Sequence, residues 1–76
     1  MTQNIVEKAI LVLSNVPKGK VFVLRDLVPP IIWYNLELHI RANLGMKFYI
    51  WVINEGSHLV RPTDKTDEEQ QRYIMI

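Results

Sequence analysis

The side chains best suited to chemistry in this sequence are two histidines and a late group of carboxylates. His39 and His58 lie far apart, and the carboxylates near them do not follow the spacing of a metal site. Cysteine is absent, which excludes disulfides and thiolate ligands and fits a reducing compartment. No nucleophile is paired with a base, and no glycine-rich phosphate loop is present. The sequence therefore predicts neither an enzyme nor a bound cofactor or metal.

The charged residues are unevenly distributed along the chain. The formal net charge is +1, whereas nucleic-acid-binding domains usually carry a clear basic excess. The first half is mildly basic, and Lys18 and Lys20 could contact phosphate there or simply be solvated beside a turn. The late part is acidic, through Asp64, Asp67, Glu68 and Glu69 around Lys65. This acidic run is expected either to form a solvated loop or to meet a basic partner.

Length and composition predict one small domain spanning residues 1–76. A chain of this size buries about 60 to 65% of the surface that its unfolded form exposes. The hydrophobic content is 49%, so either the core is unusually full or some apolar surface meets a partner. The N-terminal run lacks the features of a signal peptide, and Glu7 and Lys8 interrupt its apolar residues. We therefore expect a soluble, cytoplasmic protein with no membrane span.

The longest proline-free stretch, residues 35–54, has two interpretations. Its even-numbered positions are apolar almost throughout, which is typical of strands with one buried face, and Gly45 would then lie in a hairpin turn. Leu44, Phe48 and Val52 instead recur at every fourth residue and would share one face of a helix.

Signals at both ends of this stretch favour the helix. Asn35 is a good N-cap, and Glu37 would lie in the first turn, where the helix dipole favours an anion. Gly56 follows at the place where a left-handed C-terminal cap belongs. We therefore predict one continuous helix from Asn35 to Asn54.

The sequence of the first part of the chain predicts a helix, a strand and a second helix. Apolar residues at helical spacing predict the first helix from Thr2 to about Asn15, and Val21–Leu24 has the composition of a short strand. Pro29 and Pro30 leave only a short, imperfect helix between Asp26 and Trp33.

The last part of the chain predicts a β-hairpin. Its strands are expected at His58–Arg61 and Arg72–Ile76, separated by a polar loop from Pro62 to Gln70, and the strand beginning at Val21 is available as a third partner. The resulting order is helix, strand, helix, helix, strand, strand. This α+β order is that of a small winged helix-turn-helix domain.

A family resemblance rests on residues spread over most of the chain. They are Phe22, Leu24, Asp26, Leu27, Trp33, Arg41, Leu44, Gly45, Phe48, Val52, Lys65, Gln71 and Tyr73. Through them the chain resembles a family of small uncharacterised bacterial and phage proteins, catalogued as a domain of unknown function and similar to winged helix-turn-helix modules. It departs from the family pattern at Pro29-Pro30, where a glycine-containing turn is more usual. The resemblance favours the helical interpretation of residues 35–54 and implies a fold, but no activity.

If this fold is correct, the outer face of the long helix carries the candidate nucleic-acid contacts. Asparagine and lysine are residue types that contact base edges or phosphates in a major groove. The primary prediction is therefore a duplex-DNA-binding module, a small regulator acting as a homodimer. Its predicted contacts are His39, Asn43, Lys47, Lys18, Lys20 and Arg25.

The same face also supports a protein partner. Met46 and Ile50 are apolar where a recognition helix is usually polar, and the acidic run would repel phosphate. Apolar residues flanked by polar ones are typical of protein interfaces. The alternative prediction is an interaction module of the adaptor or phage-inhibitor kind. Its predicted interface residues are Met46, Ile50, Asp64, Asp67, Glu68 and Glu69.

Several other side chains carry structural expectations. Arg41 is expected on the core-facing side of the long helix, where it would form an ion pair with Asp26 or contact phosphate. Tyr34, Tyr49 and Trp51 are expected in the core, because aromatic side chains of this density usually pack there.

Overall fold

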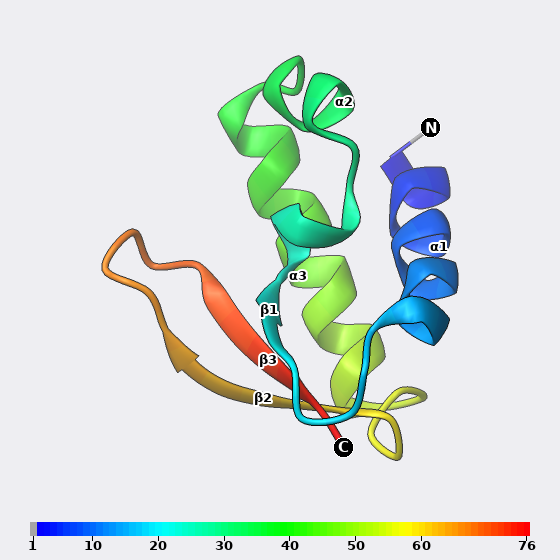
Figure 1. Ribbon diagram of the computed structural model, residues 1–76. Helices are drawn as coiled ribbons and strands as arrows, with labels where there is room; N and C mark the ends of the chain where they lie inside the picture. Colours follow the sequence, from blue (N-terminus) through cyan, green and yellow to red (C-terminus); the bar gives the residue numbers. More distant parts are fainter. Residues whose placement is uncertain (1) are drawn as a thin grey trace.

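The computed structural model describes the backbone of residues 2–76 and the side chains from residue 5 onward. In chain order the elements are α1 (Thr2–Val12), η1 (Leu13–Asn15), β1 (Val21–Val23), η2 (Leu24–Leu27), α2 (Pro30–Tyr34), α3 (Leu38–Ile53), β2 (Val60–Lys65) and β3 (Gln71–Met75). The predicted α+β class is confirmed, with α-helices and one three-stranded antiparallel sheet (Figure 1). In this described part of the chain, no helix has both the length and the apolar character needed to cross a bilayer.

The helix α3 confirms the helical interpretation of the central stretch. It continues without a break through Gly45, so no hairpin forms there. Leu44, Phe48 and Val52 are completely buried, because their spacing places them on one helix face. This face packs against α1 and the sheet.

The predicted start of this helix and its predicted cap at Gly56 are wrong, whereas the predicted end at Asn54 is confirmed, since Asn54 is the C-cap. Asn35 continues the last turn of α2, where its Nδ2 donates to the carbonyl oxygen of Ile31 at 2.7 Å. Glu37 has the extended backbone of an N-cap and holds that position instead. Gly56 has no left-handed backbone. Its N–H donates to the carbonyl oxygen of Trp51 at 2.9 Å, and the Trp51 ring occupies the space into which a Cβ would project.

The predicted helix between Asp26 and Trp33 is divided into η2 and α2. Val28, which precedes Pro29, is extended, because a proline disfavours helical dihedrals in the residue before it. Pro30 is the first residue of α2. At this position a backbone N–H would have no partner within the helix, so proline costs no hydrogen bond there. Asp26 anchors η2, since its Oδ2 accepts a hydrogen bond of 3.1 Å from the backbone N–H of Val23.

The sheet has the strand order β1-β3-β2, so β1 covers one edge of the β2–β3 hairpin. Tyr73 in the central strand pairs with Phe22 on one side and Pro62 on the other. Proline is tolerated here because β2 is an edge strand. β2 begins later than predicted and continues to Lys65, which shortens the predicted polar loop to the β2–β3 loop, residues 66–70.

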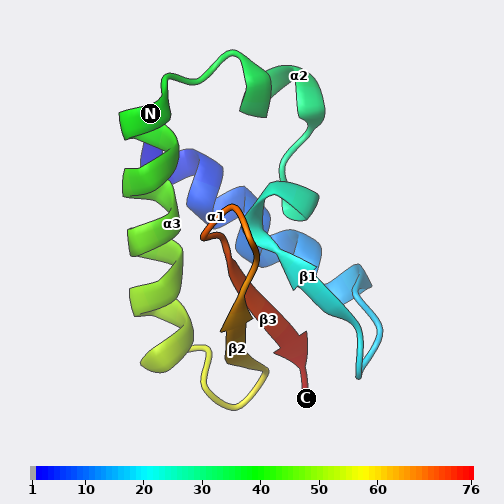
Figure 2. The ribbon, with the colours of Figure 1, turned by 90° about the vertical axis from the view of Figure 1, so that its left-hand side faces the viewer.

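Aromatic side chains join α3 to the sheet. Tyr73 stacks on Phe22 with ring centroids 5.8 Å apart, and it meets Phe48 edge-on at 5.0 Å. Phe48 in turn stacks on Trp51 at 6.0 Å. These contacts hold α3 against the sheet, which lies beside it in Figure 2.

Candidate functional site

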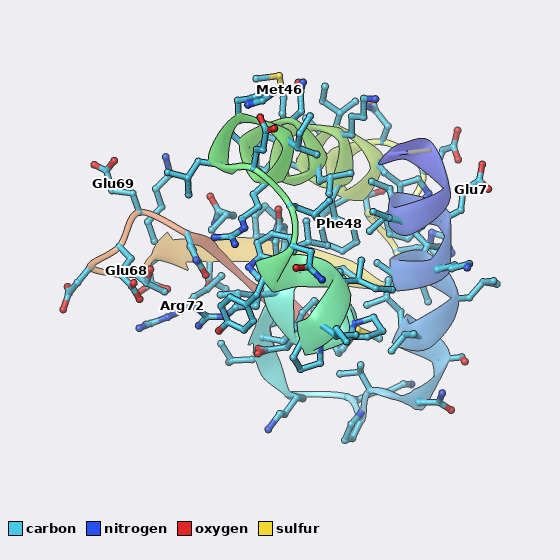
Figure 3. All side chains as sticks on the ribbon, turned by 90° about the horizontal axis from the view of Figure 1, so that it is seen from above. Glu7, Met46, Phe48, Glu68, Glu69 and Arg72 are labelled. Atoms are coloured by element: carbon cyan, nitrogen blue, oxygen red, sulfur yellow. The ribbon has the colours of Figure 1, made fainter. Side chains whose placement is uncertain are left out.

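The outer face of α3 is an apolar stripe that runs along the whole helix. At about 100° per residue its members share one side of the helix, opposite the buried face. The large side chains among them are 38% to 78% exposed. Figure 3 shows Met46 projecting away from the body while Phe48 projects into it. The stripe consists of Leu38, Ala42, Met46, Tyr49, Ile50 and Ile53.

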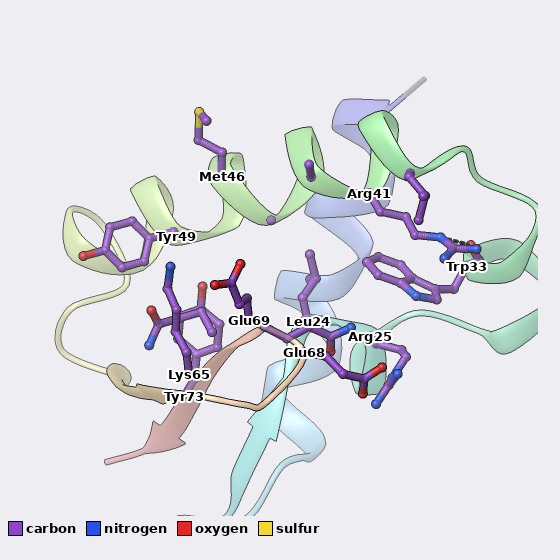
Figure 4. Close-up of a pocket in the computed structure, with 15 residues that line it drawn as sticks. Leu24, Arg25, Trp33, Arg41, Met46, Tyr49, Lys65, Glu68, Glu69 and Tyr73 are labelled. Carbon is purple, nitrogen blue, oxygen red and sulfur yellow. Dashed lines mark hydrogen bonds between the residues drawn. The ribbon is translucent and has the colours of Figure 1, made fainter.

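A cleft of about 640 Å³ lies next to this stripe, between α3 and the β2–β3 loop (Figure 4). Members of the stripe, together with Gly45, form the α3 side of the cleft. The β2–β3 loop contributes Glu68, Glu69 and Gln70, and further lining comes from Leu24, Trp33 and Tyr73. Because α3 side chains belong to both features, the stripe and the cleft form one continuous surface.

Arg41 marks one end of the cleft. Its Nε donates to the carbonyl oxygen of Trp33 at 3.1 Å, and its guanidinium carbon lies 5.6 Å from the ring centroids of both Trp33 and Tyr34. The expected ion pair with Asp26 does not form, since that carboxylate accepts from the N–H of Val23. Arg41 is therefore positioned by cation–π contacts and a carbonyl group.

The expectation that the other aromatic residues lie in the core is only partly correct. Trp51 packs partly buried against the core. Tyr34 and Tyr49 are exposed at 63% and 38%, respectively. Tyr49 lines the cleft, whereas Tyr34 lies beside Arg41 and is not part of the lining.

The β2–β3 loop places a carboxylate in the cleft. Backbone bonds of 2.9 Å from Thr66 to Gln70 and from Glu69 to Thr66 close the loop. Glu69 has a φ of 63°, a left-handed conformation that costs a non-glycine residue about 1 kcal/mol. Figure 4 shows its carboxylate directed toward α3, whereas Glu68 lies beside Arg25.

Gly45 leaves an open position in the middle of α3. It lines the cleft, and a Cβ built on it meets no atom within 4 Å. Glycine inside a helix is about 1 kcal/mol less favourable than alanine. No neighbouring atom among the described residues would clash with a methyl side chain at Gly45. The space above Gly45 is therefore open to the cleft.

The predicted nucleic-acid contacts do not come together. His39, Asn43 and Lys47 are exposed on α3, and Arg25 lines the cleft. Lys18 and Lys20 lie in the turn before β1, which is held beside the end of β3 by a 2.7 Å hydrogen bond from the Gly19 N–H to the Met75 carbonyl oxygen. In Figure 2 this turn and α3 lie on opposite sides of the molecule. The predicted residues thus form no single basic surface.

The predicted protein-interface residues lie closer together. Met46 and Ile50 are 62% and 51% exposed and belong to the apolar stripe. Glu68 and Glu69 line the cleft beside them. Asp67 is exposed in the same loop, while Asp64 lies on β2, where its Oδ2 pairs with Arg72 Nη1 at 3.1 Å.

The histidines occupy separate surface positions. His39 Nδ1 lies 3.2 Å from Glu37 Oε2 at the start of α3, and both side chains are exposed. His58 is exposed in the segment between α3 and β2. Among the residues whose side chains are described, no three histidines or carboxylates are close enough to hold a metal ion.

Comparison with known proteins gives the chain a family. Residues 7–74 match the family model described as Domain of unknown function (DUF1413). The chain belongs to this family. No curated protein and no solved structure matches it. The DUF1413 domain covers nearly the whole fold, including every residue of the stripe and the cleft.

Parts of this DUF1413 site were not found by sequence reasoning. Gly45 was assigned to a possible turn and to the pattern of the resembled family, and nothing in the sequence indicated a role for it inside a helix. The contact of Arg41 with Trp33 has no comparable signal in the sequence, because it depends on how α3 packs against the end of α2. The left-handed backbone of Glu69 lies in the local turn from Thr66 to Gln70, and glutamate does not mark such a position in a sequence.

Proposed function

We propose that this DUF1413 protein is a non-enzymatic protein-interaction module with winged-helix architecture. Its ligand is an amphipathic helix of a partner protein, which lies along the apolar stripe of α3. The observation that carries this proposal is the stripe itself, which leaves large aliphatic side chains exposed from one end of α3 to the other.

The element and strand orders support the winged-helix assignment. Three helices are interleaved with strands in the order α1, β1, α2, α3, β2, β3, and β1 pairs with β3 at the edge of the hairpin. In this arrangement α3 presents its outer face to a ligand and the β2–β3 loop is the wing.

The dimensions and chemistry of α3 suit a helical ligand. Its 16 residues span about 24 Å, and stripe residues recur at the three- and four-residue spacings by which helices dock in grooves. The stripe residues themselves are uncharged, so an apolar helix face can cover them, while the exposed polar side chains of His39 and Asn43 lie on the same face of α3 and would contact the ligand. The wing beside it adds the exposed carboxylates of Asp67, Glu68 and Glu69.

Ile50→Asp is expected to weaken binding of an amphipathic helix at least about tenfold. The probe is a fluorescein-labelled peptide of roughly 18 residues with leucine on one face and glutamine on the other, long enough to cover α3. We expect saturable binding on the order of 1–100 μM by fluorescence anisotropy, weakened at least about tenfold by the buried aspartate.

Leu11→Asp is the matched control, because Leu11 is 73% exposed on α1, away from the stripe. It should bind the peptide like the wild type, and circular dichroism should show both variants folded. Equal binding by the Ile50 variant and the wild type would refute the proposal. A different outcome is that the peptide does not bind, that the protein alone sediments as a dimer, and that Ile50→Asp dissociates this dimer. That outcome would mean that the stripe binds a second copy of the chain and not a helix of another protein.

Duplex DNA is a second candidate ligand, favoured by one observation. His39, Asn43 and Lys47 follow each other at four-residue spacing and form an exposed polar line beside the stripe. The test is an electrophoretic mobility shift of duplex DNA at low salt. DNA would be the primary ligand if the protein shifts the duplex, if the shift weakens steeply as salt is raised, and if Lys47→Glu abolishes it. We rank it second because the stripe is apolar and the wing acidic, so both oppose a phosphate backbone.

A further inference from the structure

We infer that the cleft between α3 and the β2–β3 loop selects a neutral hydrogen-bond acceptor on the docked helix, with the Tyr73 hydroxyl as the donor. This inference rests on the proposed function, since it concerns the chemistry of the ligand helix at the same site. It narrows the ligand to an amphipathic helix that carries glutamine or asparagine along the edge that faces the loop.

The Tyr73 hydroxyl is a buried polar group without a partner in the chain. Tyr73 is only 2% exposed, yet it lines the cleft, and Figure 4 shows its phenol oxygen directed toward α3. Among the residues whose side chains are described, no group forms a hydrogen bond with this oxygen. In the same part of the chain, every side-chain oxygen of a covered residue that is closed off from solvent does have a partner. The Tyr73 hydroxyl therefore keeps access to solvent, and the cleft provides it.

Packing holds the hydroxyl in this position. The Tyr73 ring lies between Phe22 and Phe48, with ring centroids 5.8 and 5.0 Å away. The ring therefore cannot turn to find another partner when a ligand covers the cleft. Burial raises the pKa of Tyr73 to about 12, so the phenol keeps its proton at neutral pH and is available as a donor.

A helix that covers the cleft removes water from this hydroxyl. A donor that loses water and gains no acceptor opposes binding. Leucine, lysine and arginine side chains offer no acceptor, because they are apolar or carry donors alone. Glutamine and asparagine each present a carbonyl oxygen, so either residue can restore the lost hydrogen bond.

The charges that line the cleft favour a neutral acceptor over a carboxylate. Figure 4 shows Lys65 beside Glu69 at the Tyr73 end of the cleft. It also shows Arg25 beside Glu68, so the charges on the loop side offset each other. A ligand carboxylate at the hydroxyl would meet the charge of Glu69, whereas an amide adds no charge.

Arg41 does not supply the missing acceptor or a competing site beside Tyr73. Its guanidinium lies at the other end of the cleft, where it contacts the carbonyl oxygen of Trp33 and two aromatic rings. Like the hydroxyl, it offers only donors. The choice between ligand side chains at Tyr73 is therefore made by hydrogen bonding.

The test compares three fluorescein-labelled peptides of roughly 18 residues, long enough to cover α3. They share one leucine face and differ only along its two edges, which carry glutamine, methionine or glutamate. Methionine is similar in length to glutamine but lacks the carbonyl oxygen. By fluorescence anisotropy, we expect the wild-type protein to bind the glutamine peptide about tenfold more tightly than the methionine peptide and about threefold more tightly than the glutamate peptide.

Tyr73→Phe removes the donor and keeps the packed ring. It should reduce the preference for the glutamine peptide over the methionine peptide from about tenfold to about twofold or less. Tyr34→Phe is the matched control, because it removes a phenol oxygen from a ring that is 63% exposed and does not line the cleft. This control should keep the wild-type preference, and circular dichroism should show both variants folded.

The outcomes are distinguishable. Equal wild-type affinity for the glutamine and methionine peptides, or the same preference in Tyr73→Phe as in the wild type, would overturn the role of the hydroxyl. Tightest binding by the glutamate peptide would overturn the selection of a neutral group. In these cases the peptides would still bind, and the proposed function would stand. If none of the three peptides binds, the proposed function itself is lost.

Discussion

Gly56→Ala is expected to destabilise the protein by about 1–3 kcal/mol, a fall in melting temperature on the order of 10 °C. A Cβ at Gly56 would lie 2.5 to 2.8 Å from three ring atoms of Trp51. The ring cannot move aside without cost, because it stacks on the fully buried Phe48. Thermal and urea unfolding followed by circular dichroism measure the effect.

Gly45→Ala is the matched control, since it makes the same chemical change in α3 where the space is open. It should shift the melting temperature upward, so the two alanine variants are expected to differ in sign. Gly56→Ala with wild-type stability would show that the Trp51 ring does not lie over residue 56. In that case the packing of Trp51 would not be the reason for glycine after the end of α3.

Raising the pH from 10 to 12 is expected to lower the unfolding free energy by about 2 kcal/mol through Tyr73. Burial, with a smaller contribution from the neighbouring Tyr49, raises the pKa of Tyr73 from 10.0 to about 12. In this window the unfolded chain loses a phenol proton that the folded protein retains. The stabilisation is complete below pH 10 and is lost as the pH rises through the folded-state pKa.

Tyr73→Phe is the control for this titration, because it keeps the ring that contacts Phe22 and Phe48 and removes the ionisable group. Urea unfolding at pH 9, 10, 11 and 12 should give a steeper fall for the wild type than for the variant. Parallel curves for the two proteins would mean that the Tyr73 phenol is not buried from solvent.

The central helix was predictable because its signal is local and repeated. Leu44, Phe48 and Val52 recur at the period of an α-helix, and all are completely buried. The competing alternation at even positions failed because it counts residues such as Met46 and Ile50 as buried, whereas both are exposed. The α+β class followed from this helix together with the β-branched and aromatic residues of the strands.

The ends of elements were less predictable, because neighbouring segments compete for the same residues. Asn35 has the side chain of an N-cap, yet the preceding helix α2 takes it into its own last turn. Pro62 suggested a loop, yet an edge strand tolerates it opposite Tyr73. In each case a contact outside the local window decided the outcome.

The candidate site was predicted in its parts but not in its arrangement. The exposed position of Met46 and Ile50 and the acidic character of the β2–β3 loop were predicted from sequence. The separation of Lys18 and Lys20 from α3 was not, because it depends on how the turn before β1 is held beside β3.

By itself, the sequence determined a long helix with one fully buried face, a hairpin with an acidic tip, and an apolar content that is high for a chain of this length. Those properties follow from residue type and short-range spacing. Only the tertiary structure decided that Gly56 leaves room for the Trp51 ring and that Arg41 stacks on Trp33. It also decided that Glu69 and Gly45 line opposite sides of a single cleft. The physical reason is that a cleft forms between segments distant in the chain, so its width, charge and open positions arise only when α3 packs against the hairpin.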